Sequence, residues 1–257
     1  MSSDQQAGFQ SWCGHALVVG SGGIGLALVE ALLERAPHLQ LWASNRSGVP
    51  KPLRSPVERA ASVHWMSLDL TASESLQALH QRAIEQLRPL RLVINASGVL
   101  HGAHLQPEKR LSQVTGDALD RCFRVNAFGP LLLAQAVEAA MPMDLPVHFA
   151  SLSARVGSIG DNQLGGWYSY RGAKAAQNQL LHTLALEWRR RRPLTCVTLL
   201  HPGTTATPLS EPFRSSVPPE RLFSPERAAQ QLLDVLQSQH AAASGRFVAW
   251  DGQEIPW

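Results

Sequence analysis

Cysteine is scarce in this sequence, long apolar runs are absent, and neither sign of charge dominates. The 257 residues include three cysteines. Cys13, Cys122 and Cys196 form no C-x-x-C pair, which argues against a disulfide framework and a zinc site. No apolar run approaches the roughly 18 residues of a membrane span, and the first dozen residues lack the basic and apolar pattern of a signal peptide. We expect a cytoplasmic protein that binds no metal ion and contacts no membrane.

The net charge of +3 gives no basis for nucleic-acid binding. The densest basic run, residues 189–192, precedes Pro193 at the expected end of a helix, where cations complement the helix dipole and are solvated. A nucleic-acid patch is the alternative interpretation of this run. We expect no nucleic-acid partner.

Short apolar runs alternate with longer helical patterns along the chain. The runs predict strands at residues 16–19, 39–43, 63–66, 92–94, 147–150, 195–200 and 246–250. The longer segments predict helices at residues 24–35, 73–87, 117–141, 169–190 and 225–238. Such alternation is typical of right-handed crossovers in a mostly parallel sheet.

The predicted class is therefore α/β, a doubly wound Rossmann fold with seven strands and helices on both faces. We expect one NAD(P)-binding domain over residues 1–257, because no repeat or break in composition marks a second one. Residues 1–13 form a polar N-terminal extension in this interpretation. Residues 44–62 and 203–224 are rich in proline and serine and are expected to be loops.

A glycine-rich turn follows the first predicted strand and opens a helix. Its residues are Gly20, Ser21, Gly22, Gly23, Ile24 and Gly25, which fit the pattern G-x-G-x-x-G. Glycine permits the tight turn and lets the backbone approach a pyrophosphate, and the helix N-terminus supplies free N–H groups for the phosphates. The alternative is an ordinary turn, but the strand–turn–helix context favours dinucleotide binding.

Tyr170 and Lys174 lie four residues apart near the start of a predicted helix, and therefore on one face. A free phenol has a pKa of about 10 and is a slow acid–base group at neutral pH. A nearby ammonium group and an oxidised nicotinamide both stabilise the phenolate. Tyr170 can then exchange a proton with a substrate oxygen while a hydride moves at carbon. The alternative is an exposed pair, because Y-x-x-x-K occurs often by chance.

Polar residues accompany this pair at the carboxyl ends of predicted strands, the edge where open α/β sheets bind ligands. Ser151 and Ser153 end the fifth strand, residues 95–98 follow the fourth, and residues 201–207 follow the sixth. Asn126 lies within the helix predicted at 117–141, where an amide has below-average propensity. The alternatives are simple turns and, for Asn126, a buried amide that bonds backbone groups.

These motifs together resemble the short-chain dehydrogenases/reductases, from about residue 14 to the end of the chain. The chain is most similar to the C-factor-like and sniffer-like carbonyl reductases, in residues 153–159, 165–171 and 251–257. The resemblance implies a catalytic tetrad of Asn126, Ser153, Tyr170 and Lys174. In that tetrad Lys174 also holds the nicotinamide ribose, and Asn126 orders a water molecule in a proton relay.

The resemblance also implies further contacts to the cofactor. Asp69 would contact the adenine, and residues 208–224 would form a mobile loop over the substrate. The remaining cofactor-binding residues implied in this way are Leu70, Asn95, Ala96, Ser97, Gly98, Pro202, Gly203, Thr205 and Thr207.

Two departures from the family pattern bear on the site. The usual motif has three residues between its first two glycines, whereas Ser21 and Gly22 alone separate Gly20 from Gly23. Family members also often have a second serine where this chain has Ala154, and that second serine is commonly the catalytic one. Three alternatives follow. Ser153 is the catalytic serine and acts from a slightly shifted strand, Ser151 is the catalytic serine, or the catalytic site is weakened.

The end of the second predicted strand bears on the choice of cofactor. NAD-specific sites place an acidic residue there to bind the ribose 2′-hydroxyl. This chain has Asn45 and Arg46 at that point and no carboxylate between Glu34 and Glu58. A guanidinium pairs with a 2′-phosphate through two parallel hydrogen bonds. The sequence therefore favours NADP(H) over NAD(H), and the alternative is that Arg46 is a solvated loop residue.

The predicted function is an NADP-dependent oxidoreductase that interconverts a carbonyl group and an alcohol. A cofactor-binding sensor with little turnover is the alternative, and a sugar-nucleotide epimerase is disfavoured because the short tail leaves little room for a substrate domain. Apolar residues of the loop at 203–224, with Trp167 nearby, indicate an apolar small-molecule substrate. These loop residues are Leu209, Pro212, Phe213, Leu222 and Phe223.

The helix at 169–190 is apolar over more than one stripe. Apolar residues recur at positions 173, 176, 180 and 184, and again at 181, 185 and 188. A surface helix needs a single stripe to face its own core. We therefore predict a homodimer or homotetramer in which the extra face meets a second subunit.

Overall fold

A computed structural model describes residues 8–54 and 61–257 of the protein. Parts of the predicted N-terminal extension (1–7) and of the first loop (55–60) lie outside the described residues. The described chain forms a seven-stranded sheet in the order β3-β2-β1-β4-β5-β6-β9, in which all paired neighbours are parallel. Its strands are β1 (Gly14–Val19), β2 (Leu39–Asn45), β3 (His64–Ser67), β4 (Leu90–Asn95), β5 (Val147–Leu152), β6 (Thr195–His201) and β9 (Arg246–Ala249).

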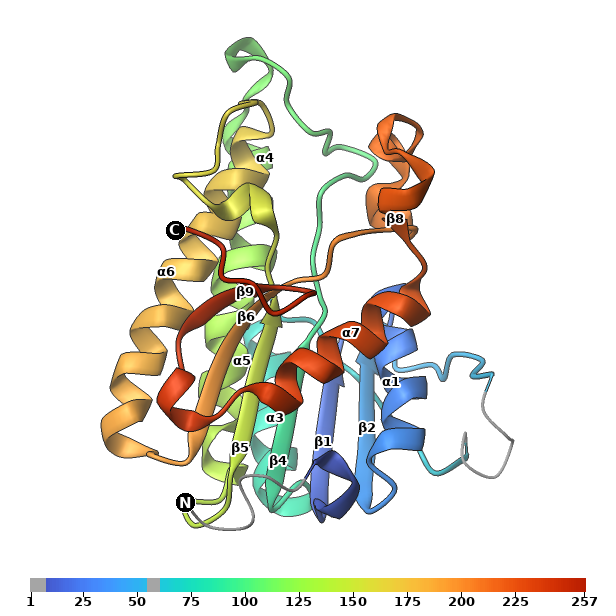
Figure 1. Ribbon diagram of the computed structural model, residues 1–257, viewed down its shortest axis with the longest axis vertical. Helices are drawn as coiled ribbons and strands as arrows, with labels where there is room; N and C mark the ends of the chain where they lie inside the picture. Colours follow the sequence, from blue (N-terminus) through green and yellow to red (C-terminus); the bar gives the residue numbers. More distant parts are fainter. Residues whose placement is uncertain (1–7, 55–60) are drawn as a thin grey trace.

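The strand order reverses at β1. From β1 the chain moves outward through β2 to β3, and then returns to β4 on the other side of β1. Ligands bind outside the carboxyl ends of the strands at such a switch point. The carboxyl ends of β1 and β4 therefore mark the place to look for a site, at the upper edge of the sheet in Figure 1.

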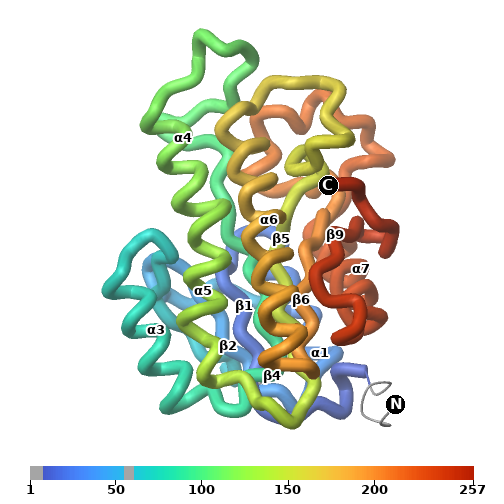
Figure 2. Tube along the Cα trace, turned by 90° about the vertical axis from the view of Figure 1, so that its left-hand side faces the viewer, coloured from blue at the N-terminus to red at the C-terminus, as the bar shows by residue number. Residues whose placement is uncertain are grey.

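Helices cover both faces of the sheet. The helices α1 (Ile24–Arg35) and α7 (Pro225–Ser238) lie on one face, and α3 (Ser73–Gln86), α5 (Gly129–Val137) and α6 (Tyr168–Arg191) lie on the other (Figure 1 and Figure 2). The helix α4 (Gly116–Phe123) extends beyond the carboxyl edge of the sheet, above α5.

The two faces of the sheet have separate hydrophobic cores. Successive side chains of a strand point to opposite faces. In β1, Leu17 and Val19 accordingly pack with α3, α5 and α6, while Ala16 and Val18 pack with α1 and α7. The predicted doubly wound α/β fold with seven strands is confirmed.

The helix predicted at 117–141 is not continuous. A π-helical segment (Arg124–Phe128) separates α4 from α5, and the last turn, η5 (Glu138–Ala140), is a 3₁₀ helix. The side chain of Asn126, in the middle of the π segment, bonds the backbone of Val99 across the site. A π turn adds a residue and so rotates the helix face, and such turns are frequent at functional sites. Sequence periodicity cannot register this local change.

The predicted loop at 203–224 contains short regular elements. Two two-residue strands, β7 (Thr204–Thr205) and β8 (Leu222–Phe223), pair in parallel. Between them lie the 3₁₀ helices η7 (Pro208–Ser216) and η8 (Pro219–Arg221). We call residues 203–224 the substrate loop. The other 3₁₀ helices are η2 (Phe9–Ser11), η3 (Leu111–Gln113), η6 (Arg155–Gly157) and η9 (Ala241–Ala243).

Much of the wide apolar face of α6 is used within the chain. Leu181, Ala185 and Trp188 are buried in the core, and Leu180 and Leu184 pack partly against their own chain. The oligomeric state stays a prediction. No helix within residues 8–54 and 61–257 is long and apolar enough to cross a membrane.

Candidate active site

The glycine-rich turn lies between β1 and α1, as the sequence predicts. The N–H groups of Gly20 and Ser21 both donate to the carbonyl oxygen of Ser44 at the end of β2, at 3.2 and 2.9 Å. A Cβ atom on Gly25 would lie 1.9 Å from the carbonyl oxygen of Gly20. Only glycine at position 25 therefore lets α1 begin this close to the turn, with Ile24 as its first residue and Gly22 and Gly23 before it.

The end of β2 lies next to this turn. The Asn45 amide donates to the carbonyl oxygen of Val49 at 2.8 Å and to the Ser21 hydroxyl at 3.4 Å. Arg46 follows β2 directly, and its backbone carbonyl accepts a hydrogen bond from Ser67 at 2.8 Å. This arrangement brings Asn45 and Arg46 to the side of the glycine turn where the sequence predicts a 2′-phosphate.

Asp69 and Leu70 follow β3. The Asp69 carboxylate accepts hydrogen bonds from the N–H and hydroxyl groups of Thr71, at 2.9 and 2.7 Å. These bonds, with a smaller contribution from the charge of Arg46, lower the pKa of Asp69. Leu70 is buried and lies close to Gly129, the first residue of α5. Asp69 is thus an ionised group near the predicted adenine site, and Leu70 belongs to the core beneath it.

Residues 95–98 connect β4 to both neighbouring strands. The Asn95 side chain donates to the Ser151 hydroxyl at 2.9 Å and accepts from the Ser97 hydroxyl at 2.6 Å. The backbone N–H of Ala96 donates to the carbonyl oxygen of Val19 at 2.7 Å. A Cβ atom on Gly20 would lie 2.7 Å from the backbone nitrogen of Ser97. The turns after β1 and β4 are therefore in direct contact. We call the surface formed by the glycine turn and residues 95–98 the floor of the site.

Asn126 closes the far side of this floor. Its amide accepts from the N–H of Val99 at 2.9 Å and donates to the carbonyl oxygen of Val99 at 2.8 Å. A Cβ atom on Gly98 would lie 3.3 Å from the Asn126 oxygen. The amide therefore bonds backbone groups, as the alternative interpretation of the sequence has it. Its role in ordering a water molecule stays a prediction.

Tyr170 and Lys174 lie on the inner face of α6, and both are almost completely buried. Tyr170 is 7% exposed and Lys174 is 3% exposed. The Lys174 ammonium donates to the carbonyl oxygen of Leu152 at 2.8 Å and to the Gln177 side chain at 2.9 Å. It lies 5.8 Å from the centre of the Tyr170 ring. The spacing of four residues thus places the phenol and the ammonium together at the end of β5.

Burial changes the acid–base properties of both groups. It raises the pKa of Tyr170, with a smaller contribution from Cys122, and it lowers the pKa of Lys174 to about 7. A low-dielectric environment disfavours the charged form of each group. Desolvation is the largest effect on the phenol here. The stabilisation of the phenolate by Lys174 and by an oxidised nicotinamide stays a prediction. A phenol that stays protonated at neutral pH is a proton donor.

The two candidate serines differ in their hydrogen bonds. The Ser151 hydroxyl, within β5, accepts from Asn95 at 2.9 Å and from Gln177 at 3.0 Å. The Ser153 hydroxyl donates to the Asn178 side chain at 2.6 Å. Ser151 is therefore held on two sides inside the core. Ser153 can donate to a substrate oxygen only if it exchanges its bond to Asn178, and its catalytic role stays a prediction.

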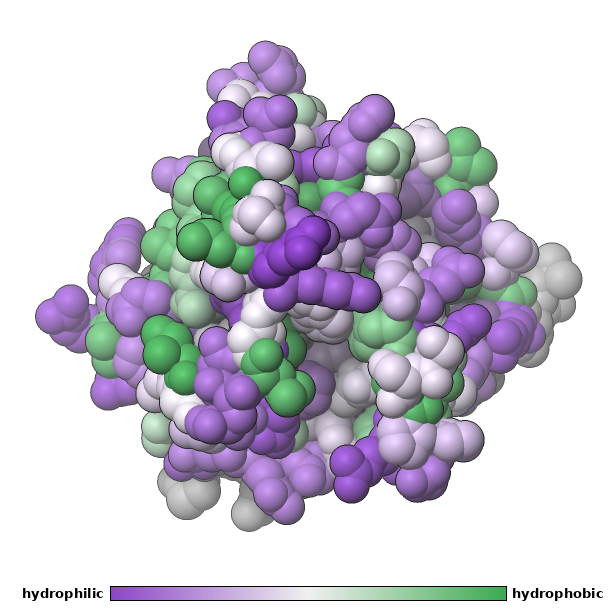
Figure 3. All heavy atoms as spheres, turned by 90° about the horizontal axis from the view of Figure 1, so that it is seen from above, coloured by the Kyte–Doolittle hydropathy of each residue, from purple (hydrophilic) through white to green (hydrophobic). Residues whose placement is uncertain are grey.

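The substrate loop lies across the glycine turn. A Cβ atom on Gly23 would lie 2.6 Å from the Thr207 methyl group, so these residues are in close contact. The Nε2 atom of His101 is 2.8 Å from the carbonyl oxygen of Pro208. Figure 3 looks onto this end of the molecule and shows a hollow between the side of α4 and α6 and the side of the substrate loop.

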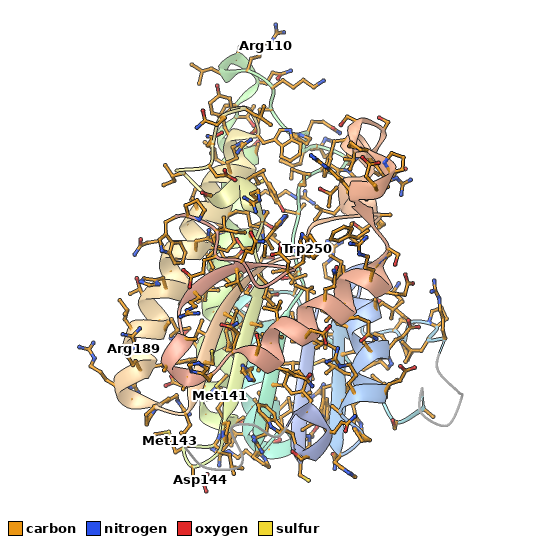
Figure 4. The ribbon with its side chains drawn as sticks, in the orientation of Figure 1. Arg110, Met141, Met143, Asp144, Arg189 and Trp250 are labelled. Atoms are coloured by element: carbon orange, nitrogen blue, oxygen red, sulfur yellow. The ribbon has the colours of Figure 1, made fainter. Side chains whose placement is uncertain are left out.

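The base of the substrate loop packs on the end of the sheet. Pro202 follows β6, and Gly203 has a φ of 75° with its Cα against Phe223 and Trp250. The Phe223 and Trp250 rings lie 4.8 Å apart, with Trp250 near the centre of Figure 4. The Thr205 carbonyl accepts from the Ser210 hydroxyl at 2.6 Å. These contacts hold the base of the loop, with Thr205 and Thr207, near the carboxyl edge of the sheet.

Aromatic side chains connect the substrate loop to Tyr170. The centre of the Trp167 ring lies 6.3 Å from that of Tyr170 and 5.0 Å from that of Phe213 in the substrate loop. The rings of Tyr170, Trp167 and Phe213 thus form a continuous apolar wall, with Trp167 in the middle. The sequence predicts an apolar pocket of this kind, but not the order of the rings.

Three buried polar residues of the site, Gln177, Asn178 and Glu108, belong to none of the motifs in the sequence. Gln177 and Asn178 follow Lys174 at helical spacing on the same buried side of α6, and this spacing was a usable signal. Glu108 bonds Ser169 from a loop 61 residues away, and nothing local in the sequence indicates that contact. Among residues 8–54 and 61–257, no group of three or more histidine, cysteine, aspartate or glutamate side chains is arranged to hold a metal ion.

Comparison with known proteins identifies relatives of this chain. Residues 14–218 match the family model described as short chain dehydrogenase. The chain is similar to 1-hydroxy-2-glutathionyl-2-methyl-3-butene dehydrogenase of Rhodococcus sp. (strain AD45), with 33% identity over 191 residues, 74% of this chain and 78% of the relative. It is also similar to C-signal of Myxococcus xanthus, with 32% identity over 137 residues, 53% of this chain and 77% of the relative.

Solved structures share the fold. The NADPH-bound carbonyl reductase from chicken fatty liver superposes with a TM-score of 0.79 and 24% sequence identity, over 95% of this chain and 99% of that chain. At this level of identity the likeness supports the fold alone.

Proposed function

Since the chain is an oxidoreductase of the short-chain dehydrogenase family, we propose that it interconverts a carbonyl group and an alcohol, with NADP(H) as cofactor and Tyr170 as general acid and base. The observation that carries this proposal is the buried Tyr170–Lys174 pair at the carboxyl end of β5. A protonated phenol and an ammonium group of lowered pKa, side by side in a buried site, are suited to proton transfer.

The residues at the carboxyl edge fit a dinucleotide. Gly20 and Gly25 permit a tight turn that no side chain would allow, because a Cβ atom on either would clash with neighbouring backbone atoms, and α1 begins within this turn at Ile24. Free N–H groups at a helix N-terminus attract phosphates. The bound nicotinamide supplies or accepts the hydride. Asn95 to Gly98 form part of the floor of the site, and Thr205 and Thr207 lie at the base of the substrate loop, within the set of residues that would hold the cofactor.

The chain's own residues move the proton. In the direction of reduction, the Tyr170 hydroxyl donates to the carbonyl oxygen as a hydride reaches the carbon. The resulting phenolate is stabilised by the neighbouring Lys174, whose ammonium is oriented by the carbonyl of Leu152 and by Gln177. Positioned acid–base groups of this kind contribute typically about 10²–10⁴ in rate.

The preference for NADP(H) rests on Arg46. Its backbone is held at the end of β2, next to Asn45 and the glycine turn, and its side chain is exposed. In this proposal the Arg46 guanidinium pairs with the 2′-phosphate of NADP(H). Charge-assisted hydrogen bonds contribute about 1.5–3 kcal/mol each, so loss of this pairing should lower NADPH affinity about 10- to 100-fold. NADH affinity, which involves no 2′-phosphate, stays within about twofold.

The test of the cofactor preference is a fluorescence titration of NADPH and NADH into the wild type and Arg46→Ala. Arg82→Ala, an exposed arginine on α3, is the matched control. Equal affinities of the wild type for both cofactors, or an unchanged preference in Arg46→Ala, would contradict the assignment.

We propose an apolar substrate, on the evidence of the wall formed by Tyr170, Trp167 and Phe213. The Rhodococcus relative bears the name of a dehydrogenase that acts on a glutathione-conjugated alcohol. The experiment that tests the function is a panel of aldehydes, ketones and quinones, assayed by NADPH consumption, with glutathione-conjugated alcohols assayed by NADP⁺ reduction.

A cofactor-binding sensor with little turnover is the second candidate. Ala154 at the position after Ser153, and the similarity to C-signal, favour it. The buried Tyr170–Lys174 pair favours the enzyme, because a binding protein has no chemical need for these groups. Micromolar binding of NADPH without turnover on any member of the panel would support the sensor.

A further inference from the structure

Glu108 is a buried carboxylate that the proposed chemistry does not use. It lies in the segment between β4 and α4 and is 3% exposed. Arg110, two residues further on, lies at the outer tip of the molecule in Figure 4. The chain therefore turns inward at Glu108 and places a carboxylate beneath the start of α6. Burial and the charge of Glu108 together raise the pKa of the neighbouring Cys122 thiol to about 11.

Glu108 accepts hydrogen bonds from residues at the start of α6. Its carboxylate accepts a short hydrogen bond from the Ser169 hydroxyl and a second bond from the Ser169 N–H group at 3.4 Å. Its backbone carbonyl accepts from the N–H group of Trp167 at 2.5 Å. An isolated buried carboxylate is costly, so this set of bonds is what makes its burial tolerable.

The start of α6 has no cap of its own. The N-cap residue is Trp167, which makes no capping hydrogen bond with its side chain, and the first turn contains no acidic residue. Three left-handed residues precede the helix, namely Gly165, Gly166 and Trp167, with φ values of 64°, 66° and 51°. The φ of Trp167 is unfavourable for a bulky side chain. The free N–H groups and the positive end of the helix dipole both favour a carboxylate at this position.

Tyr170 lies one residue after Ser169, and the Trp167 ring lies against it. Lys174, the other member of the Tyr170–Lys174 pair, is held separately by its bonds to Leu152 and Gln177. The position of the phenol along the pocket therefore depends on where the first turn of α6 begins. The Glu108 carboxylate bonds this turn through Ser169.

We propose that Glu108 is a positioning residue: it caps α6 from another part of the chain and thereby holds Tyr170 and Trp167 in the geometry for proton transfer. This inference rests on the proposed carbonyl reductase function. It assigns a role in turnover to a side chain that touches neither substrate nor cofactor.

The test compares Glu108→Gln with the wild type. Glutamine keeps the shape and can still accept from the Ser169 hydroxyl, but its NH₂ group cannot accept from the Ser169 N–H group. Misplacement by about 1 Å costs on the order of 10²-fold in rate, so we expect kcat to fall about 10- to 100-fold. NADPH affinity and KM should change less than about threefold, because the glycine turn is untouched. Glu85→Gln, an exposed glutamate on α3, is the control and should keep wild-type kcat.

Ser169→Ala provides the second variant, because it removes the partner and leaves the carboxylate. If Glu108 acts through Ser169, the double variant should lose no more activity than Glu108→Gln alone. Hydrogen exchange at residues 168–171 should accelerate in each variant. Ser169→Ala also keeps the inference testable if Glu108→Gln does not fold.

The outcomes separate this inference from the proposed function. Wild-type kcat in folded Glu108→Gln, with or without a lower melting temperature, would overturn the positioning role and leave the proposed reaction intact. Additive losses in the double variant would also overturn it. Absence of NADPH consumption by the wild type on every carbonyl compound would overturn the proposed function, and the role of Glu108 in turnover with it.

Discussion

Replacement of Tyr170 by phenylalanine separates chemistry from stability in this protein. Among the described residues no hydrogen bond joins the Tyr170 hydroxyl to another protein group, although the side chain is 7% exposed. Removal of the hydroxyl therefore leaves no protein donor or acceptor unpaired, and the ring keeps its packing against Trp167. We expect the free energy of unfolding to change by less than about 1 kcal/mol.

The effect on turnover should be much larger. The phenol is the proposed proton donor, and such groups contribute typically about 10²–10⁴ in rate. We expect kcat of Tyr170→Phe to fall by about that factor, while NADPH affinity changes little, because Lys174 keeps its bonds to Leu152 and Gln177.

The chain offers a matched control. Its one other tyrosine is Tyr168, which lies two residues before Tyr170 and is 43% exposed. Tyr168→Phe makes the same chemical change on the same helix and should keep wild-type turnover. The assay is NADPH consumption with the best carbonyl compound of the panel, together with urea unfolding of each variant. Tyr170→Phe with most of the wild-type activity would refute the mechanism, and so would equal losses in both variants.

Three further predictions concern the serines, the assembly and the acid stability. Ser153→Ala should reduce turnover far more than Ser151→Ala. Ser151→Ala should mainly cost stability, about 1–3 kcal/mol, because the buried Asn95 amide loses its acceptor and the Gln177 amide keeps only its bond to Leu152. Steady-state kinetics with urea unfolding checks both, and the reverse order of kcat would move the catalytic role to Ser151. The protein should be a homodimer or homotetramer, since Leu132 on α5, Leu186 on α6 and Phe128 in the π segment remain 38%, 43% and 47% exposed. A monomer by light scattering at micromolar concentration contradicts this. Burial lowers the pKa of His148 from 6.5 to about 4, so the unfolded state binds a proton at this group more readily than the folded state. Because of this group, the free energy of unfolding should fall by roughly 3 kcal/mol as the pH drops from 6.5 to 4. Above pH 6.5 this group should leave it unaffected. His148→Phe should make that decline shallower in urea unfolding at the two pH values, and an equally steep decline would rule out His148 as its source.

The sequence by itself determined the sheet and the position of the site along it. All seven predicted strands of the large sheet are present, because buried parallel strands are short apolar runs whatever their neighbours are. The glycine turn follows β1 for the same local reason, since Gly25 faces the backbone of Gly20 within one turn of chain. Tyr170 and Lys174 share a face because helical periodicity alone brings them together.

The tertiary structure decided what surrounds those groups. The direction in which the pKa of Tyr170 shifts depends on burial of the phenol. The sequence spacing between Tyr170 and Lys174 gives no information about that burial. The break at residues 124–128 accompanies the bond of Asn126 to Val99, 27 residues away, and the helix pattern is blind to it. Ser153 faces Asn178 rather than open space, and Glu108 caps α6 across 61 residues. Hydrogen bonds between distant segments form only after the chain has folded, and single polar side chains carry no periodic signal that would reveal them beforehand.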